Sequence, residues 1–394
     1  MRTGLLSQTV RRVCTLAVSI VTLVVVGAPV GMTADAADPL ADDLGFFFKV
    51  DDAKDCVFDH QRHRLYVTNE KQVIVLDTKD RNTIKSIELP GKVRACDIAP
   101  DMKHVGVAPF NGQFLYWISL DDLEVSQVRF KADATETGVF DLCVGSDGSI
   151  LFSMVYLNSA GAASGWVKLR RFDPKTTAVT DVGRVRMDTV VSASADRQFA
   201  AVAEGNISSG PLKVFDFQEQ QLRDVTSTNA FIYEIACSAE AKYFARPHGN
   251  GCDLYDAKGS RLGNLAGKPV ICAAFHPKAD RLFVMRHGET KIEEYALSSQ
   301  KVAAEYPLEK ALVISGNVNE HIVANLHSVG RDALIGHVSR VRSVHYKTFQ
   351  SGRVRVSDDG ESLFVVVPAG VYMFATKKPT SDETGPKIKV IEAR

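Results

Sequence analysis

The sequence predicts an all-β protein built from short antiparallel sheets that repeat around a ring. Groups of three short strands, rich in β-branched and aromatic residues, recur about every forty residues. A further strand, ending in a similar polar turn, precedes each group. No segment keeps the 3.6-residue apolar spacing of an amphipathic helix. These observations are typical of a β-propeller with seven or eight four-stranded blades.

The first repeat shows the pattern most clearly. Residues Arg64 to Glu88, RLYVTNEKQVIVLDTKDRNTIKSIE, predict strands at Leu65–Thr68, Val73–Leu76 and Ile84–Ile87. The polar turns TNEKQ and DTKDRN separate these strands, so the segment is a meander of antiparallel hairpins.

Later copies follow in the same order. Their predicted strands are 105–108, 114–118 and 125–130; 150–156, 166–172 and 178–182; 199–203, 212–217 and 222–225; 243–245, 252–255 and 262–265; 282–285, 292–297 and 302–306; and 363–367 with 371–375. Residues 310–350 form a weak further copy. Accepting this copy gives eight blades and rejecting it gives seven, and the sequence leaves the choice open.

An aspartate often ends the third strand of a repeat. Its carboxylate can accept backbone N–H bonds in the turn that follows, which explains the residue type without any catalytic role. These aspartates are Asp77, Asp121, Asp173, Asp216 and Asp256.

The two ends of the repeat region predict how the ring closes. The last repeat, Arg353 to Thr376, lacks an obvious fourth strand, and we expect Phe46–Val50 to supply it. The propeller would then span residues 44–376, followed by a C-terminal tail at 377–394 in which Ile388–Ile391 can pair on an edge.

The N-terminus predicts export. Residues 1–36 combine a basic start, an apolar run at 13–30 and the small-residue site Ala34-Asp35-Ala36, as in a cleaved signal peptide. The alternative is a retained anchor formed by residues 13–30. We therefore expect a periplasmic, cell-surface or secreted protein that contacts a membrane only if the signal is not cleaved.

Composition and charge narrow the function further. With 28 Gly, 14 Pro and 45% hydrophobic residues, the chain is neither disordered nor collagen-like. The 47 basic and 47 acidic residues balance, which disfavours a nucleic-acid partner. We expect a monomer.

Cysteines recur at one position of the repeat. They lie on the predicted innermost strand, just before its turn, where neighbouring blades should be too far apart for a disulfide or a thiolate metal site. The sequence therefore predicts free, buried thiols and an inner surface of Cys, Ala, Ser and Val that suits packing better than polar catalysis. The residues at the repeated position are Cys56, Cys96, Cys143, Cys237 and Cys272.

One stretch resembles a known repeat family. The string RLYVTNEKQVIVLDTKDRNTIKSIELPGKVRACDIAPDMKHVGVA is similar to the YVTN-type β-propeller repeat, through Tyr66-Val67-Thr68-Asn69, Val73–Asp77 and Ala99–Asp101. The resemblance implies a propeller that is often exported. It implies no single function, because similar propellers include surface-layer and adhesion modules, lactonases and cofactor-bearing dehydrogenase subunits.

Two short motifs suggest chemistry that their context opposes. LFVMRHGET, Leu282 to Thr290, resembles a histidine-phosphatase signature, with His287 as nucleophile and Arg286 as phosphate ligand. It aligns with a strand and hairpin turn of the first repeat, so we interpret it as a hairpin. His60 and His63 have a spacing that would suit a metal on a helix, but they fall in a predicted turn.

A basic stretch and one long loop are the candidate binding surfaces. The stretch at 321–355, which also contains Arg353 and Arg355, is predicted as a solvated edge or a surface for an anionic partner. The Gly/Ala/Ser-rich loop beginning at Asn158 is the longest insertion between strands. Our partner-surface candidates are His327, Arg331, His337, Arg340, Arg342 and His345.

The resulting functional hypothesis is an exported, non-catalytic propeller that binds or scaffolds a protein or cell-envelope partner. We expect no catalytic residue, cofactor or metal. The alternative is a propeller enzyme or cofactor-bearing subunit, lactonase-like or dehydrogenase-like, which would need polar residues or a metal around the channel.

Overall fold

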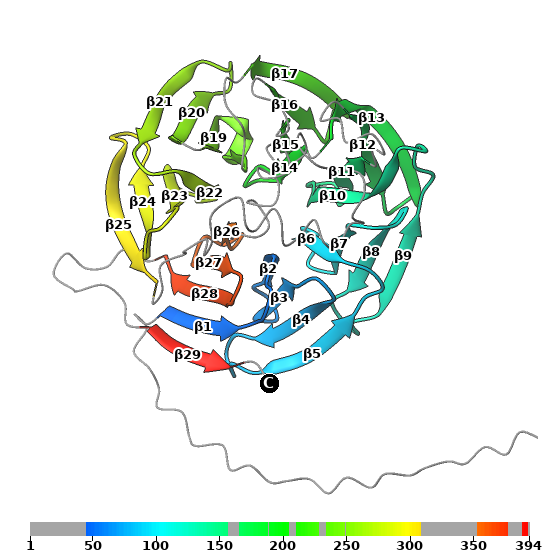
Figure 1. The fold of residues 1–394 in the computed structure, drawn as a ribbon, viewed down its shortest axis with the longest axis horizontal. Coiled ribbons are helices and arrows are strands. Elements are labelled where there is room, and N and C mark those ends of the chain that lie inside the picture. The colour runs from blue at the N-terminus through cyan, green and yellow to red at the C-terminus, as the bar shows by residue number, and fades with distance from the viewer. Residues whose placement is uncertain are drawn as a thin grey trace, which may run out of the picture. The chain divides into compact units, whose positions relative to one another are not determined.

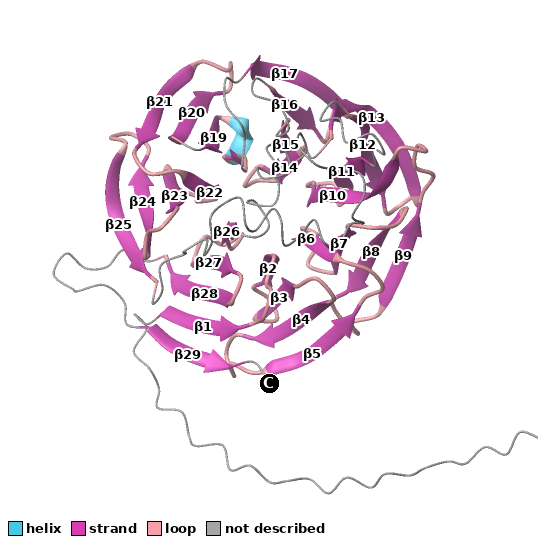
Figure 2. Ribbon diagram, in the orientation of Figure 1, coloured by secondary structure: helices cyan, strands magenta, loops and turns pink. Residues whose placement is uncertain are grey.

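Seven sheets, antiparallel apart from one outer strand pair, surround a central hub in a computed structural model of the chain (Figure 1). The structure describes residues 45–156, 165–187, 189–204, 210–227, 234–248, 250–308, 353–376 and 388–392, all within one unit at 41–394. Apart from the short turn η1 (Ala239–Ala241), the regular elements of this part of the chain are strands (Figure 2). The predicted all-β propeller is confirmed, with seven four-stranded blades.

The first three blades follow one another directly along the chain, and each runs from an inner to an outer strand. Their strands are β2 (Asp55–Asp59), β3 (Arg64–Thr68), β4 (Gln72–Asp77) and β5 (Thr83–Glu88); β6 (Val93–Ile98), β7 (His104–Pro109), β8 (Phe114–Ser119) and β9 (Val125–Arg129); β10 (Glu136–Val144), β11 (Ile150–Tyr156), β12 (Trp166–Asp173) and β13 (Ala178–Arg186).

The next three blades repeat this order. Their strands are β14 (Val190–Ala193), β15 (Phe199–Ala203), β16 (Pro211–Asp216) and β17 (Gln221–Ser227); β18 (Ala236–Cys237), β19 (Tyr243–His248), β20 (Gly251–Asp256) and β21 (Arg261–Ala266); β22 (Val270–Phe275), β23 (Arg281–Arg286), β24 (Lys291–Ala296) and β25 (Lys301–Pro307).

The seventh blade joins the two ends of the ring. It contains β26 (Arg353–Val356), β27 (Ser362–Val367), β28 (Gly370–Ala375) and β1 (Gly45–Lys49), and β29 (Ile388–Glu392) lies outside β1. β1 pairs antiparallel with β28, placing Phe48 opposite Val371, and β29 pairs parallel with β1. The predicted closure by the N-terminal strand and the edge pairing at 388–391 are both confirmed.

The core lies between adjacent blades, because each sheet is apolar on both faces near the hub. Tyr66 and Val75 of the first blade pack with Val105 and Ile118 of the second. The outer strand β5 (TIKSIE) has one buried side chain, Ile87, since its other residues reach the rim. Burial thus falls from hub to rim, as radial packing of wedge-shaped sheets requires.

The turn aspartates act as their residue type predicts, with one exception. The Oδ1 atom of Asp77 accepts hydrogen bonds from the backbone N–H groups of Lys79 and Asp80, both at 2.8 Å. Asp173, Asp216 and Asp256 accept similar bonds in their own turns. In the second blade this role falls to Asp122, which accepts from Glu124, while Asp121 pairs with Arg62 instead.

Several sequence predictions lie outside the described residues. They are the signal region 1–36, the possible anchor at 13–30, the long loop from Asn158, the weak copy at 310–350, and the tail before 388. No helix that the structure describes is long and apolar enough to cross a bilayer.

Candidate functional site

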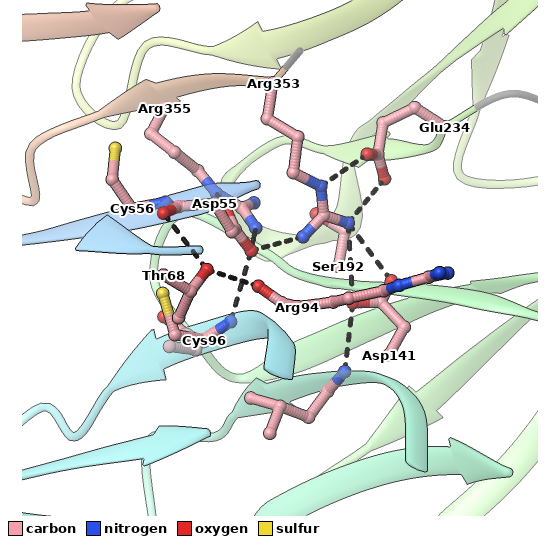
Figure 3. A network of polar contacts seen from close by, with 12 residues as sticks. Asp55, Cys56, Thr68, Arg94, Cys96, Asp141, Ser192, Glu234, Arg353 and Arg355 are labelled. Atoms are coloured by element: carbon pink, nitrogen blue, oxygen red, sulfur yellow. Dashed lines mark hydrogen bonds and ion pairs between the residues drawn. The ribbon is translucent and has the colours of Figure 1, made fainter. Parts of the chain in front are cut away.

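The hub contains a buried arginine that connects distant blades. Arg353 begins β26, and its guanidinium donates to Glu234 (Nε to Oε2, 2.9 Å), to Asp141 (Nη2 to Oδ2, 3.2 Å) and to Asp55. Figure 3 shows these three carboxylates turned toward it. The Arg353 side chain is 1% exposed, and those of Asp55 and Asp141 are fully buried. One side chain therefore ties the closing blade to the first blade, the third blade and the residue leading into the fifth.

A second arginine on the same strand completes the cluster. Arg355 donates from Nε to Asp55 Oδ1 at 3.0 Å and from Nη2 to Asp55 Oδ2 at 2.8 Å. This fork-shaped pairing fixes both carboxylate oxygens in one plane. The two arginines and the three carboxylates (Asp55, Asp141 and Glu234) form the hub cluster.

The hub cluster adds to one expectation and corrects another. Cys, Ala, Ser and Val line the inner strands as expected, but acidic and arginine side chains that the sequence analysis did not predict occupy the centre. Arg353 and Arg355 were grouped with a stretch predicted as a solvated edge or a surface for an anionic partner, yet both pair with Asp55 inside the ring. The physical reason is that a narrow channel admits long side chains when opposite charges meet inside it.

Aspartates on three consecutive inner strands also join each blade to the next. Asp55 Oδ2 accepts the backbone N–H of Cys96 at 3.2 Å, and Asp97 Oδ2 accepts that of Val144 at 2.7 Å. Asp141 Oδ2 accepts the N–H of Val191 at 3.0 Å. Because each bond crosses a blade boundary, these carboxylates hold the first four inner strands in register around the hub.

The hub cluster divides its carboxylates into two electrostatic types. Burial alone would raise the pKa of Asp55, but Arg353 and Arg355 outweigh it and hold that pKa below its ordinary value. Burial raises the pKa of Asp141 to about 7, with Arg353 opposing the shift and Glu234 and Asp55 adding to it. The two carboxylates therefore differ in direction, with the pKa of Asp55 lowered by its arginine partners and that of Asp141 raised by burial.

A second arginine cross-link lies where the inner strands end. Arg197, in the turn after β14, donates from Nη1 to Asp97 Oδ2 at 2.9 Å and from Nη2 to Asp358 Oδ1 at 3.4 Å. It thereby bridges the fourth blade to the second and seventh. Its side chain is 12% exposed and that of Asp358 is 33% exposed, so this mouth cross-link (Asp97, Arg197 and Asp358) is more exposed to water than Arg353 and its carboxylate partners.

A cavity of about 130 Å³ has walls drawn from both cross-links. Its lining includes Arg197, Asp97 and Asp358 from the mouth, and Arg355 and Glu234 from the hub. Apolar side chains of the inner strands and three cysteines form much of the remaining wall. These include Phe58, Leu142, Ile235, Phe275, Val356 and Phe364, with Cys56, Cys143 and Cys237.

The six cysteines in the described part of the chain are free and buried, as predicted for the repeated set. All five members of the repeated set lie on innermost strands, and Cys252 lies on β20. Burial raises the pKa of the Cys56 and Cys143 thiols well above that of an ordinary cysteine. Since the thiolate is the nucleophile and the metal ligand, these groups act as small apolar side chains.

The phosphatase-like string forms a hairpin. Leu282–Arg286 belongs to β23, and the chain turns through His287–Thr290 into β24. The Arg286 guanidinium donates to Glu293 Oε2 at 2.7 Å and to the Tyr295 hydroxyl at 2.9 Å. These bonds occupy the group that the motif would need for phosphate, so the hairpin interpretation is confirmed.

The remaining candidates divide by position. His60 and His63 lie in the turn between β2 and β3, as their spacing in the repeat predicts. Within the described ranges, no three His, Cys, Asp or Glu side chains converge as a metal site. The partner-surface candidates lie outside the described residues; they are His327, Arg331, His337, Arg340, Arg342 and His345.

Sequence reasoning missed the carboxylates of both cross-links. A signal was present, because Asp55, Asp97 and Asp141 each lie within two residues of a repeated cysteine. Charged residues on a strand that must face a crowded hub predict counter-charges across it. The alternation Arg353-Val-Arg355 on a predicted strand carries the same signal.

Comparison with known proteins supports the fold alone. No family model matches the chain, and no curated protein matches it in sequence. Among solved structures, the chain is similar to "Kuenenia stuttgartiensis Hydrazine Synthase" with a TM-score of 0.55 and 11% sequence identity. The match covers 88% of this chain and 99% of that one. At this sequence identity the similarity indicates a shared fold and gives no information on activity.

Proposed function

We propose that the protein is an exported, non-catalytic β-propeller of the YVTN-repeat type that binds or scaffolds a protein or cell-envelope partner. The observation that carries the proposal is the pair of arginine cross-links through the channel. Arg353 and Arg197 connect blades that share no sheet, so the ring holds its shape around a fixed opening. A rigid frame of this kind presents its turns in constant positions for a partner to contact.

The binding proposal is tested by placing a photo-reactive residue at two positions of the full chain. Ala195 lines the cavity at the channel mouth, whereas Val302 is 42% exposed on the rim strand β25. Illumination in the native cell should attach one partner at position 195 and none at 302. Equal labelling at both positions, or none at either, would contradict the proposal.

Export is tested separately from binding. The intact mass of the protein purified from its native cell should correspond to a chain that begins just after Ala36 or Ala37. A mass that includes residues 13–30 would show a retained anchor and would restrict partners to the membrane surface.

One observation favours a second candidate, a propeller enzyme. Burial raises the pKa of Asp141 to about 7, a shift also common among catalytic carboxylates, although this side chain is fully buried and does not line the cavity. Metal analysis and an absorption spectrum of the purified protein would test this candidate. A stoichiometric metal or a bound chromophore would favour the enzyme over the scaffold.

A further inference from the structure

The seventh blade differs from the other six in having a fifth strand. β29 pairs with β1 in parallel, from Gly45 beside Ile388 to Lys49 beside Glu392. Among the described strands, each of the other six blades ends at its fourth. Figure 1 shows β29 as the outermost strand at this point of the rim. The outer edge of β1 therefore accepts an extended strand, whereas the fourth strands of the other described sheets are their outermost members.

β1 also differs from other fourth strands in its burial. Three of its five residues are buried, Gly45, Phe47 and Phe48. The fourth strands β5, β9, β13, β17 and β25 each have at most one buried residue. Phe47 packs on Tyr372 of β28, with ring centroids 4.5 Å apart. β1 thus has the surroundings of an interior strand, and an apolar strand of this kind is a template for pairing when its edge is open.

The strand that occupies this edge is held by few constraints. Its only neighbour in the described sheet is β1, and parallel pairs are slightly less stable per residue than antiparallel pairs. The end of β28 and the start of β29 lie on either side of β1, about 10 Å apart at the usual strand spacing. Residues 377–387, eleven in number, connect them and can span roughly 36 Å. The connection is long enough for β29 to leave the edge while the rest of the sheet stays in place.

We propose that the outer edge of β1 is a docking site for an extended segment of a partner protein, and that β29 occupies this site until such a segment displaces it. The surface is separate from the channel mouth and goes beyond the proposed function. Added strands bind through main-chain hydrogen bonds, and side chains at alternate positions supply selectivity. The sequence of β29, IKVIE, indicates what the edge accepts, which is five residues in the parallel direction, rich in β-branched side chains.

A labelled peptide with the sequence of Lys387 to Arg394, KIKVIEAR, tests the proposal on the full chain. The double variant Lys389→Pro/Val390→Pro removes two successive backbone donors, one of which faces β1, so its own tail cannot occupy the edge. The peptide should bind this variant and should bind the natural chain at least about tenfold more weakly, because the tether gives β29 an effective concentration in the millimolar range. Fluorescence anisotropy measures both affinities.

A matched variant and a photo-reactive peptide complete the experiment. Glu383→Pro/Thr384→Pro places the same two prolines in the tail outside β29, and it should bind the peptide as weakly as the natural chain does. A photo-reactive residue at the peptide position of Val390 should attach to β1, where the register places Val390 beside Phe47. If the Lys389→Pro/Val390→Pro variant does not fold, the same peptide at millimolar concentration competes with the tethered strand of the natural chain, and attachment to β1 is still expected.

Three outcomes would overturn the proposed docking site. They are no binding to the folded Lys389→Pro/Val390→Pro variant, equal affinity for that variant and the natural chain, and attachment of the peptide outside β1. A dimer of the natural chain that grows with concentration, and that the same variant lacks, would assign the edge to a second copy and would overturn the choice of partner.

Discussion

The two arginine cross-links perform the same task in different surroundings. Arg353 is 1% exposed and faces three carboxylates, whereas Arg197 is 12% exposed and faces two. Both bridge blades that do not neighbour each other in the ring: Arg353 reaches the third and fifth blades, and Arg197 reaches the second and seventh. The two cross-links differ in their access to water. A charge that solvent cannot reach depends wholly on its protein partners.

The comparison shows that similar ion pairs can contribute very different amounts to the stability of the fold. Removing one partner of a buried ion pair leaves an uncompensated charge in a low-dielectric site, while water can replace a lost partner at an exposed one. The hub cluster should therefore control stability, and the mouth cross-link should control access. Four experiments separate these roles.

The largest effect is expected for Arg353→Met. The methionine fills much of the volume but leaves Asp141 and Glu234 buried without their guanidinium partner, so the free energy of unfolding should fall by about 3–5 kcal/mol. Urea unfolding measures the loss. If the variant does not fold, the double variant Arg353→Met/Asp141→Asn should recover part of the stability, because it removes one stranded charge.

Arg197→Met should have a smaller effect. Asp97 and Asp358 are 15% and 33% exposed, so water can solvate them once the guanidinium is gone. The expected loss is about 1 kcal/mol in the same urea experiment. A loss as large as that of Arg353→Met would show that exposure does not distinguish the two cross-links.

The pH dependence of stability should reveal the raised pKa of Asp141. Its pKa is about 7 in the folded chain and about 4 when unfolded, so between these values the folded chain binds the extra proton. Its contribution to stability is complete below about pH 4 and is lost as the pH rises through 7. Asp55, whose pKa is lowered, behaves oppositely and loses its contribution only as the pH falls below about 4.

Asp141→Asn isolates that contribution. Urea midpoints at pH 5, 6, 7 and 8 should fall more steeply for the natural chain than for the variant. Parallel curves would show that Asp141 stays ionised in the ring and that Arg353 compensates its burial completely.

The smallest effect concerns thiol access. The cavity thiols should react only slowly with an aromatic disulfide reagent in the folded chain, since burial raises their pKa. Arg197→Ala shortens a side chain at the channel mouth, so labelling of Cys143 and Cys237 should become faster. Cys252 lies outside the cavity wall and should keep its rate, which serves as the internal control.

The architecture was predictable because its signal is local. Strands such as Val73–Leu76 are predicted by their β-branched composition. The turns are predicted by residues such as Asn69, whose side-chain oxygen accepts hydrogen bonds from the N–H groups of Lys71 and Gln72. Closure by Phe46–Val50 followed from counting strands in the last repeat. Each of these inferences uses residues that are close in sequence.

The hub cluster was not predicted because its partners are far apart in the chain. Arg353 is about three hundred residues from Asp55, and only the closed ring brings them together. Grouping Arg353 with a basic stretch used its neighbours in sequence, but its surroundings are set by inner strands of other blades. An arginine is usually exposed, but pairing with carboxylates of other blades allows Arg353 to be buried.

Ring closure by β1 has a consequence for synthesis. Phe46–Lys49 pairs with Gly370–Met373, so one of the first strands to be synthesised can pair only after one of the last has been synthesised. The nascent polypeptide therefore cannot complete its final sheet until almost all of it has left the ribosome. During that interval the edge of β1 is open, and a holdase chaperone that covers extended apolar segments would find its target there.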